Sequence, residues 1–128
     1  MAHIYDYAIV RVVPRVERGE FINAGVIVSC PGAKLLDCGF DLDAERLKAL
    51  DPSADVEAIR QHLAAFERIC RGGRDSGPIG ELPVRQRFHW LTAPRSSVIQ
   101  TSPAHTGRAV DAENVVERLL DSMVRVRR

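Results

Sequence analysis

Residues 5–30, which read YDYAIVRVVPRVERGEFINAGVIVSC, decide the fold because they predict a β-hairpin. Residues 5–13 carry mainly apolar side chains on both faces, so this strand is expected inside a sheet or covered on both sides. Arg11 is the exception, and Pro14 ends the strand because it cannot donate to a strand ladder. After the charged turn RVERGE, a second strand returns over residues 21–30 with a run of β-branched side chains.

Further signals extend the hairpin to a third strand. Gly25 interrupts the second strand, and a glycine there predicts a bulge or a close approach of another chain segment. Pro31 and Gly32 form a strong turn signal, and residues 34–40 then predict the third strand. Residues 5–40 are therefore expected to form an antiparallel meander.

Helical patterns follow the meander. Asp43 is a suitable N-cap for a short helix that ends before Pro52. Asp55 caps a longer helix, in which apolar residues recur at steps of three and four: Val56, Ile59, Leu63, Phe66 and Cys70. Another short helix follows Pro83, and the last helix begins near Asp111.

One later strand completes the expected fold. Residues 97–101 predict a strand that Pro103 ends, and residues 105–108 are expected to form a turn around Gly107. The sequence thus predicts a single α+β domain over residues 1–128. Its antiparallel four-stranded sheet combines the three-strand meander with this later strand, and the helices pack on one face.

Composition excludes several classes of function. The net charge of +1 offers no electrostatic attraction for nucleic acid. No window approaches the roughly 18 apolar residues of a membrane span, and the N-terminus lacks the pattern of a signal peptide. The three cysteines include no CxxC pair, and the four histidines show no HxH or HExxH spacing. We therefore expect a cytoplasmic protein with no metal and no cofactor.

Unusual polar side chains gather in residues 90–107, which read WLTAPRSSVIQTSPAHTG. Arg95 carries a fork of N–H donors that suits a carboxylate or a phosphate. Ser96 and Ser97 add hydroxyl groups directly after a proline turn, and Arg11 is a further candidate cation. These residues together predict a pocket for an anion.

Gln100 and His105 form a second group farther along the same stretch. A strand of four or five residues spans roughly 15 Å, so this group is expected to lie apart from Arg95. His105 would act as a general base only with a suitable partner, and the sequence places no acid beside it. Structural roles remain open: serine-rich turns often satisfy their own backbone, such an arginine can brace a helix end, and Trp90 is expected in the core.

Two motifs carry a family resemblance. At YDYAIVRVVPRVERGEFINAGVIV (residues 5–28) and WLTAPRSSVIQTSPAHTG (residues 90–107), the chain resembles the bacterial domain-of-unknown-function 3037 family. The resemblance extends from Tyr5 to the last helix and implies no established activity. It implies a gene context beside HipA-like kinases, and hence a kinase partner and an association with toxin–antitoxin systems.

Three functional hypotheses follow. The first is a non-enzymatic interaction or accessory protein, with a HipA-like kinase as its partner. The second is a phosphate- or nucleotide-binding domain that uses the TAPRSS turn of residues 92–97. The third is a hydrolase or transferase with His105 as the base. An open sheet edge would in addition favour pairing with a partner or a homodimer.

Overall fold

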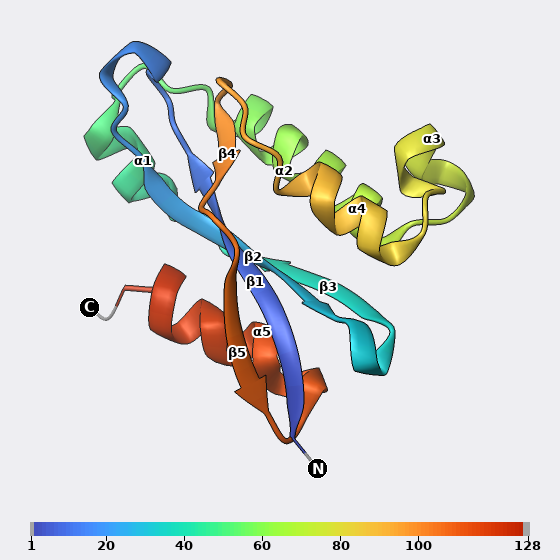
Figure 1. The fold of residues 1–128 in the computed structure, drawn as a ribbon. Helices are drawn as coiled ribbons and strands as arrows, with labels where there is room; N and C mark the ends of the chain where they lie inside the picture. Colours follow the sequence, from blue (N-terminus) through green and yellow to red (C-terminus); the bar gives the residue numbers. More distant parts are fainter. Residues whose placement is uncertain (1, 127–128) are drawn as a thin grey trace.

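The computed structural model describes residues 2–126. Its centre is an antiparallel sheet in the order β3-β2-β1-β4, and β5 also pairs with β1 (Figure 1). The strands are β1 (His3–Val12), β2 (Ile22–Cys30), β3 (Leu35–Phe40), β4 (Ile99–Thr101) and β5 (His105–Ala109). The α+β class and the antiparallel meander are thereby confirmed, and the sheet has five strands where four were expected.

The additional strand is β5, in the segment expected to be a turn. β4 pairs with residues 10–12 of β1, and β5 pairs with residues 3–7, so the two strands follow one another along the same edge. Ser102 bridges the break: its N–H donates to the Ile9 carbonyl (2.8 Å), and its hydroxyl oxygen accepts from the Ile9 N–H (2.9 Å). Ser102 thus continues the hydrogen bonding to β1 between the two strands, and the chain remains extended on both sides of Pro103.

The helices begin close to the positions that the sequence predicts. They are α1 (Ala44–Leu50), α2 (Val56–Arg71), α3 (Gly77–Gly80), α4 (Val84–Leu91) and α5 (Val115–Leu119), which continues as a π-helical turn (Leu120–Val124). The Asp43 carboxylate accepts from the Arg46 N–H, and the Asp55 carboxylate accepts from the Ala58 N–H, which confirms both N-caps. Within residues 2–126, none of these helices has the length and apolar character to cross a membrane.

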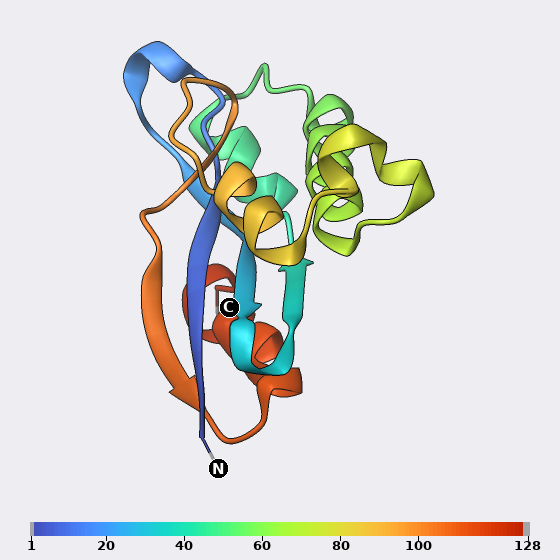
Figure 2. The ribbon, with the colours of Figure 1, turned by 45° about the vertical axis from the view of Figure 1, so that its right-hand side comes forward.

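Helices cover both faces of the sheet, so the expected packing on one face was wrong. Figures 1 and 2 show α5 apart from the other helices, alongside the lower half of the sheet. The reason lies in β2, which is apolar on both sides: Ile27 packs with the α1, α2 and α4 cluster, whereas Val26 and Val28 pack with α5. A sheet that is apolar on both faces needs cover on both.

Gly25 lies at a β-bulge, as its position in the strand predicts. Val10 pairs with Gly25 and Arg11 pairs with Asn23, so Ala24 is the extra residue of β2. On the other side of β2, the Ala24 carbonyl accepts from the Asp41 N–H (2.8 Å), which continues the register with β3. The backbone of β3 also approaches closely, because a Cβ at this position would lie 2.7 Å from the Gly39 carbonyl oxygen, so the two reasons expected for a glycine here both apply.

We expect Gly25→Ala to lower the free energy of unfolding by about 3 kcal/mol. The added Cβ would collide with the Phe40 ring and lie 2.7 Å from the Gly39 carbonyl oxygen. Gly32→Ala is the matched control, because its Cβ would meet no atom within 4 Å. Urea unfolding of both variants measures the difference, and equal stability of the two would contradict the close packing at Gly25.

An apolar groove as the candidate functional site

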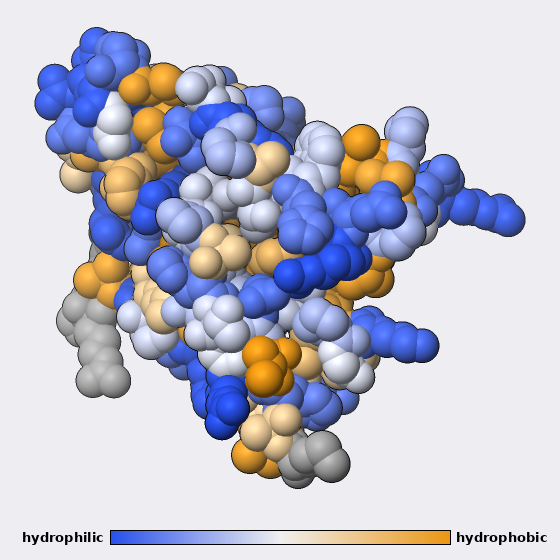
Figure 3. Space-filling model, in the orientation of Figure 1, coloured by the Kyte–Doolittle hydropathy of each residue, from blue (hydrophilic) through white to orange (hydrophobic). Residues whose placement is uncertain are grey.

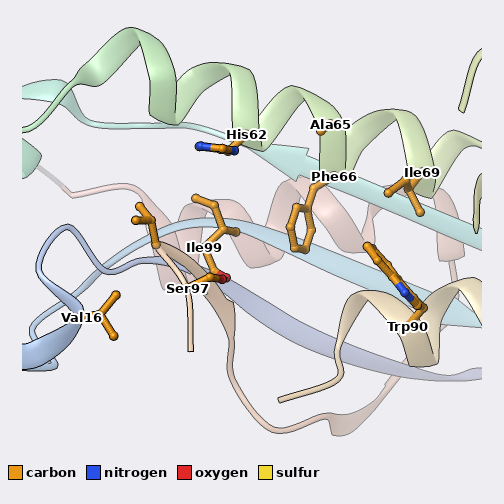
Figure 4. A pocket seen from close by; sticks show the side chains of 9 residues that line it. Val16, His62, Ala65, Phe66, Ile69, Trp90, Ser97 and Ile99 are labelled. Carbon is orange, nitrogen blue, oxygen red and sulfur yellow. The ribbon is translucent and has the colours of Figure 1, made fainter. Parts of the chain in front are cut away.

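An open apolar groove lies between α2, the end of α4 and the segment that enters β4. It has a volume of about 450 Å³, within the usual range of ligand pockets. In Figure 4, Phe66 points from α2 into the middle, with His62 at one end and Trp90 at the other. The lining residues are Val16, His62, Ala65, Phe66, Ile69, Trp90, Ser97, Val98 and Ile99.

Local structure explains the position of each wall. The apolar stripe of α2 turns Phe66 towards the core, and the flanking residues His62 and Ile69 border the groove. On the opposite wall, the Val13 N–H donates to the Val98 carbonyl (2.7 Å), which ties the segment before β4 to the sheet. One wall of the groove is therefore a regular helix, and the other is a loop segment bonded to the sheet.

Trp90 lies at the groove and not in the core, where it was expected. Its side chain is 37% exposed. Phe88 and Leu91 occupy the buried face of α4, and the helical period turns Trp90 away from that face. An exposed tryptophan next to an apolar hollow is a common feature of binding surfaces.

Arg95 stands beside this tryptophan. Its guanidinium carbon lies 4.7 Å from the centre of the Trp90 ring and 5.3 Å from that of Phe66. Its Nη2 donates to the Trp90 carbonyl at the end of α4, which is the bracing role that the sequence left open. Burial lowers the pKa of Arg95, although an arginine remains charged near neutral pH.

The neighbouring side chains of Ser97 and Gln100 are engaged with the backbone. Ser96 is exposed, and the Ser97 hydroxyl donates to the Ile99 carbonyl (2.7 Å). The Gln100 side-chain amide donates to the Ser97 carbonyl (2.9 Å). Ser97 nevertheless borders the groove, so it and Arg95 are the candidate residues that the fold places beside this hollow.

Arg11 lies on the opposite face of the sheet. Its neighbours Val10 and Val12 pack in the cluster that contains Phe66, so the alternation of the strand directs Arg11 to the α5 side. There it pairs across the strands with Gln100 and stacks 4.3 Å above the ring of Phe21. Its buried Nε has no partner among residues 2–126. The fold thus separates Arg11 from Arg95.

His105 is a third, separate position. It begins β5, where its exposed ring lies 5.5 Å from that of Tyr7. Among the described residues, no carboxylate hydrogen-bonds to it. The nearest acid in the strand ladder, Asp6, instead accepts from Thr106 (3.0 Å) and from Arg85 of α4 (2.7 Å). Asp6 therefore ties α4 to the sheet, a role that the sequence analysis missed.

The buried thiols of Cys38 and Cys70 face each other between β3 and α2. A hydrogen bond with Cys38, together with burial, raises the pKa of the Cys70 thiol far above its ordinary value. Cys30, Cys38 and Cys70 are all free and buried, as expected for Cys70 from its place on the apolar stripe. Within residues 2–126, no three His, Cys, Asp or Glu side chains gather in a group that would hold a metal ion.

We expect the raised pKa of Cys70 to make the protein less stable in alkali. The folded state keeps this thiol protonated, while the unfolded chain loses the proton above the ordinary pKa of 9.0. The stabilisation is therefore complete below pH 9.0 and falls by up to about 1.4 kcal/mol per pH unit above it. Urea unfolding at several pH values, with Cys70→Ala as the reference, measures this term; parallel pH profiles of the two proteins would contradict it.

These features define a small α+β protein with a sheet covered on both faces and an open apolar groove. The chain belongs to a family described as protein of unknown function (DUF3037), whose model matches residues 7–124. This match confirms the resemblance carried by the two sequence motifs. No curated protein and no solved structure matches the chain.

Proposed function

We propose that the protein is a non-enzymatic interaction protein that binds another protein through the apolar groove. The observation that carries this proposal is Trp90, which is 37% exposed and stacked under Arg95 beside an apolar hollow. Tryptophan and arginine are enriched among the residues that contribute most to protein–protein binding. The apolar hollow next to these two residues can accept an apolar side chain of the partner protein.

The placement of the polar candidates supports binding over catalysis. Arg95 lies on the groove side of the sheet, whereas Arg11 lies on the α5 side. His105 lies on β5. General acid–base catalysis requires its groups within hydrogen-bond reach of one reacting centre. We therefore assign His105 no catalytic role.

The partner that we propose is a HipA-like kinase, in the cytoplasm. This choice of partner is supported by the gene context that the family resemblance implies. The family model matches residues 7–124. The three cysteines, which are free and buried, support the cytoplasm as the proposed compartment. An accessory role beside such a kinase would place the protein in a toxin–antitoxin system.

Co-expression with a HipA-like kinase from the same genome tests this partner. Size exclusion is expected to give one peak that contains both chains, whereas two independent peaks would contradict the pairing. The same experiment on the protein alone measures its oligomeric state. This matters because the outer edge of β5 pairs with no strand among the described residues, and an open edge favours a homodimer.

A second candidate function is binding of a phosphate or nucleotide at residues 92–97. The specific observation in its favour is Arg95, which has no carboxylate partner among residues 2–126 and lies over an aromatic ring on which a base could stack. A thermal-shift screen with nucleotides and phosphorylated metabolites tests it. A ligand that raises the Tm of the wild type but not of Arg95→Ala is expected; no stabilisation, or an equal response of both, rules it out.

A further inference from the structure

Arg95 is an uncompensated cation beside the groove. Some surface arginines have acidic partners, such as Arg71 with Glu67, whereas others on α2, Arg60 and Arg68, have none among the described residues. What distinguishes Arg95 is its place against the aromatic rings of the groove. Arg95 has no acidic partner within residues 2–126, and its only hydrogen bond there goes to the Trp90 carbonyl. The remaining N–H donors of the guanidinium are therefore available to a ligand.

The surroundings of Arg95 select the chemistry of that ligand. The rings of Trp90 and Phe66 lie against the guanidinium at 4.7 Å and 5.3 Å, so they replace part of its water shell. The lowered pKa of Arg95 has the same cause, since burial disfavours the charged form. A carboxylate that binds the free edge of the guanidinium would form charge-assisted hydrogen bonds in this partly dry setting.

We propose that the groove recognises an acidic apolar segment of the partner protein. One apolar side chain enters the hollow beside Phe66, and a neighbouring Asp or Glu of the partner binds the edge of Arg95. This inference rests on the proposed function and adds the chemistry of the docking segment. It is a match of charge and polarity: an unpaired cation adjoins a hollow whose walls are mainly aliphatic and aromatic.

Phenylbutyrate and its neutral amide, phenylbutyramide, test this chemistry without the kinase. Each carries the same apolar body, and only the first carries a carboxylate. Trp90 is the sole tryptophan of the chain and borders the groove, so its fluorescence reports binding directly. We expect phenylbutyrate to bind about fivefold more tightly than the amide, a difference of the size usual for an ion pair that is partly exposed to water.

Two variants locate the preference. Arg95→Met keeps an unbranched side chain over the rings but removes the charge, and it is expected to abolish the difference between acid and amide. Arg118→Met is the control, because Arg118 is exposed on α5, on the other side of the sheet. Equal binding of acid and amide by the wild type, no binding of the acid, or an unchanged preference in Arg95→Met would each overturn the inference.

The outcome is separable from that of the proposed kinase partner. A preference for the acid that depends on Arg95, together with two separate peaks in size exclusion, would support the inference and contradict the kinase as partner. A stable kinase complex whose affinity is the same with Arg95→Met would contradict the inference and support the partner.

Discussion

A protein with Phe88→Ala is expected to unfold with a free energy about 4 kcal/mol below that of the wild type. Phe88 is 1% exposed and is one of the largest side chains that are fully buried. It attaches α4 to the cluster between the sheet and α2, and α4 has only eight residues with which to hold that position. Removing the ring leaves a cavity that so short a helix cannot fill.

This loss is a large part of the total stability of a domain, which is usually about 5–15 kcal/mol. Urea unfolding followed by far-UV circular dichroism measures it. Val110→Ala is the control, because Val110 is 78% exposed and should change stability by less than about 0.5 kcal/mol. A loss below about 1 kcal/mol for Phe88→Ala would contradict the packing of α4 against the sheet.

The second large effect is on the binding that we propose: Trp90→Ala is expected to weaken the proposed complex with a HipA-like kinase about a hundredfold. The indole provides both a wall of the groove and the platform for Arg95, so its removal affects the hollow and the cation together. Because the side chain is 37% exposed, the free energy of unfolding should fall much less than with Phe88→Ala. Calorimetric titration of the kinase with each variant measures the affinity.

Phe21→Ala is a closely matched control for Trp90→Ala. Phe21 is an aromatic residue that is 43% exposed, and Arg11 stacks over it at 4.3 Å as Arg95 stacks over Trp90 at 4.7 Å. Phe21 does not line the groove. We therefore expect Phe21→Ala to bind the kinase as the wild type does. Equal losses in the two variants would show a general effect of removing an exposed ring.

Much of the fold is readable from local chemistry. The meander follows from strand patterns and turn residues, and the N-caps follow from Asp43 and Asp55, because each of these features depends on neighbours in the chain. The strand β5 was missed because HTGRA lacks a strand pattern. Its pairing depends on Ser102, which restores the ladder next to Pro103 through contacts with Ile9, 93 positions away in the sequence.

The site was harder to predict because it depends on which faces remain open. The sequence singled out Arg95 and the stretch around it, and the structure places Arg95 beside a hollow. The sequence alone could not show that Arg95 and Arg11 are far apart. They lie on opposite faces of a sheet that helices cover on both sides, and this arrangement depends on the tertiary fold. The sequence also could not place Trp90 at the surface, because the exposure of this side chain depends both on its position in the helix and on the elements that pack around it.

A second hollow of about 420 Å³ lies elsewhere on the described surface, but no aromatic side chain lines it: its residues are Ser29, Pro31, Lys34, Val84 and Arg85. In Figure 3, apolar residues form separate small groups within a mainly hydrophilic face. The exposed large apolar residues at other positions, such as Ile4 and Val110, lie near the ends of β1 and β5 and do not line the groove. Single exposed apolar residues are common on monomers and need no partner.

The most direct test of the groove is an NMR titration of the labelled protein with the HipA-like kinase. The single tryptophan gives one indole N–H signal, which reports on the groove alone. Binding is predicted to shift or broaden this signal, together with the amides of α2 around Phe66 and those of residues 97–99. An unchanged indole signal, or changes confined to α5 and β3, would contradict the groove as the binding site.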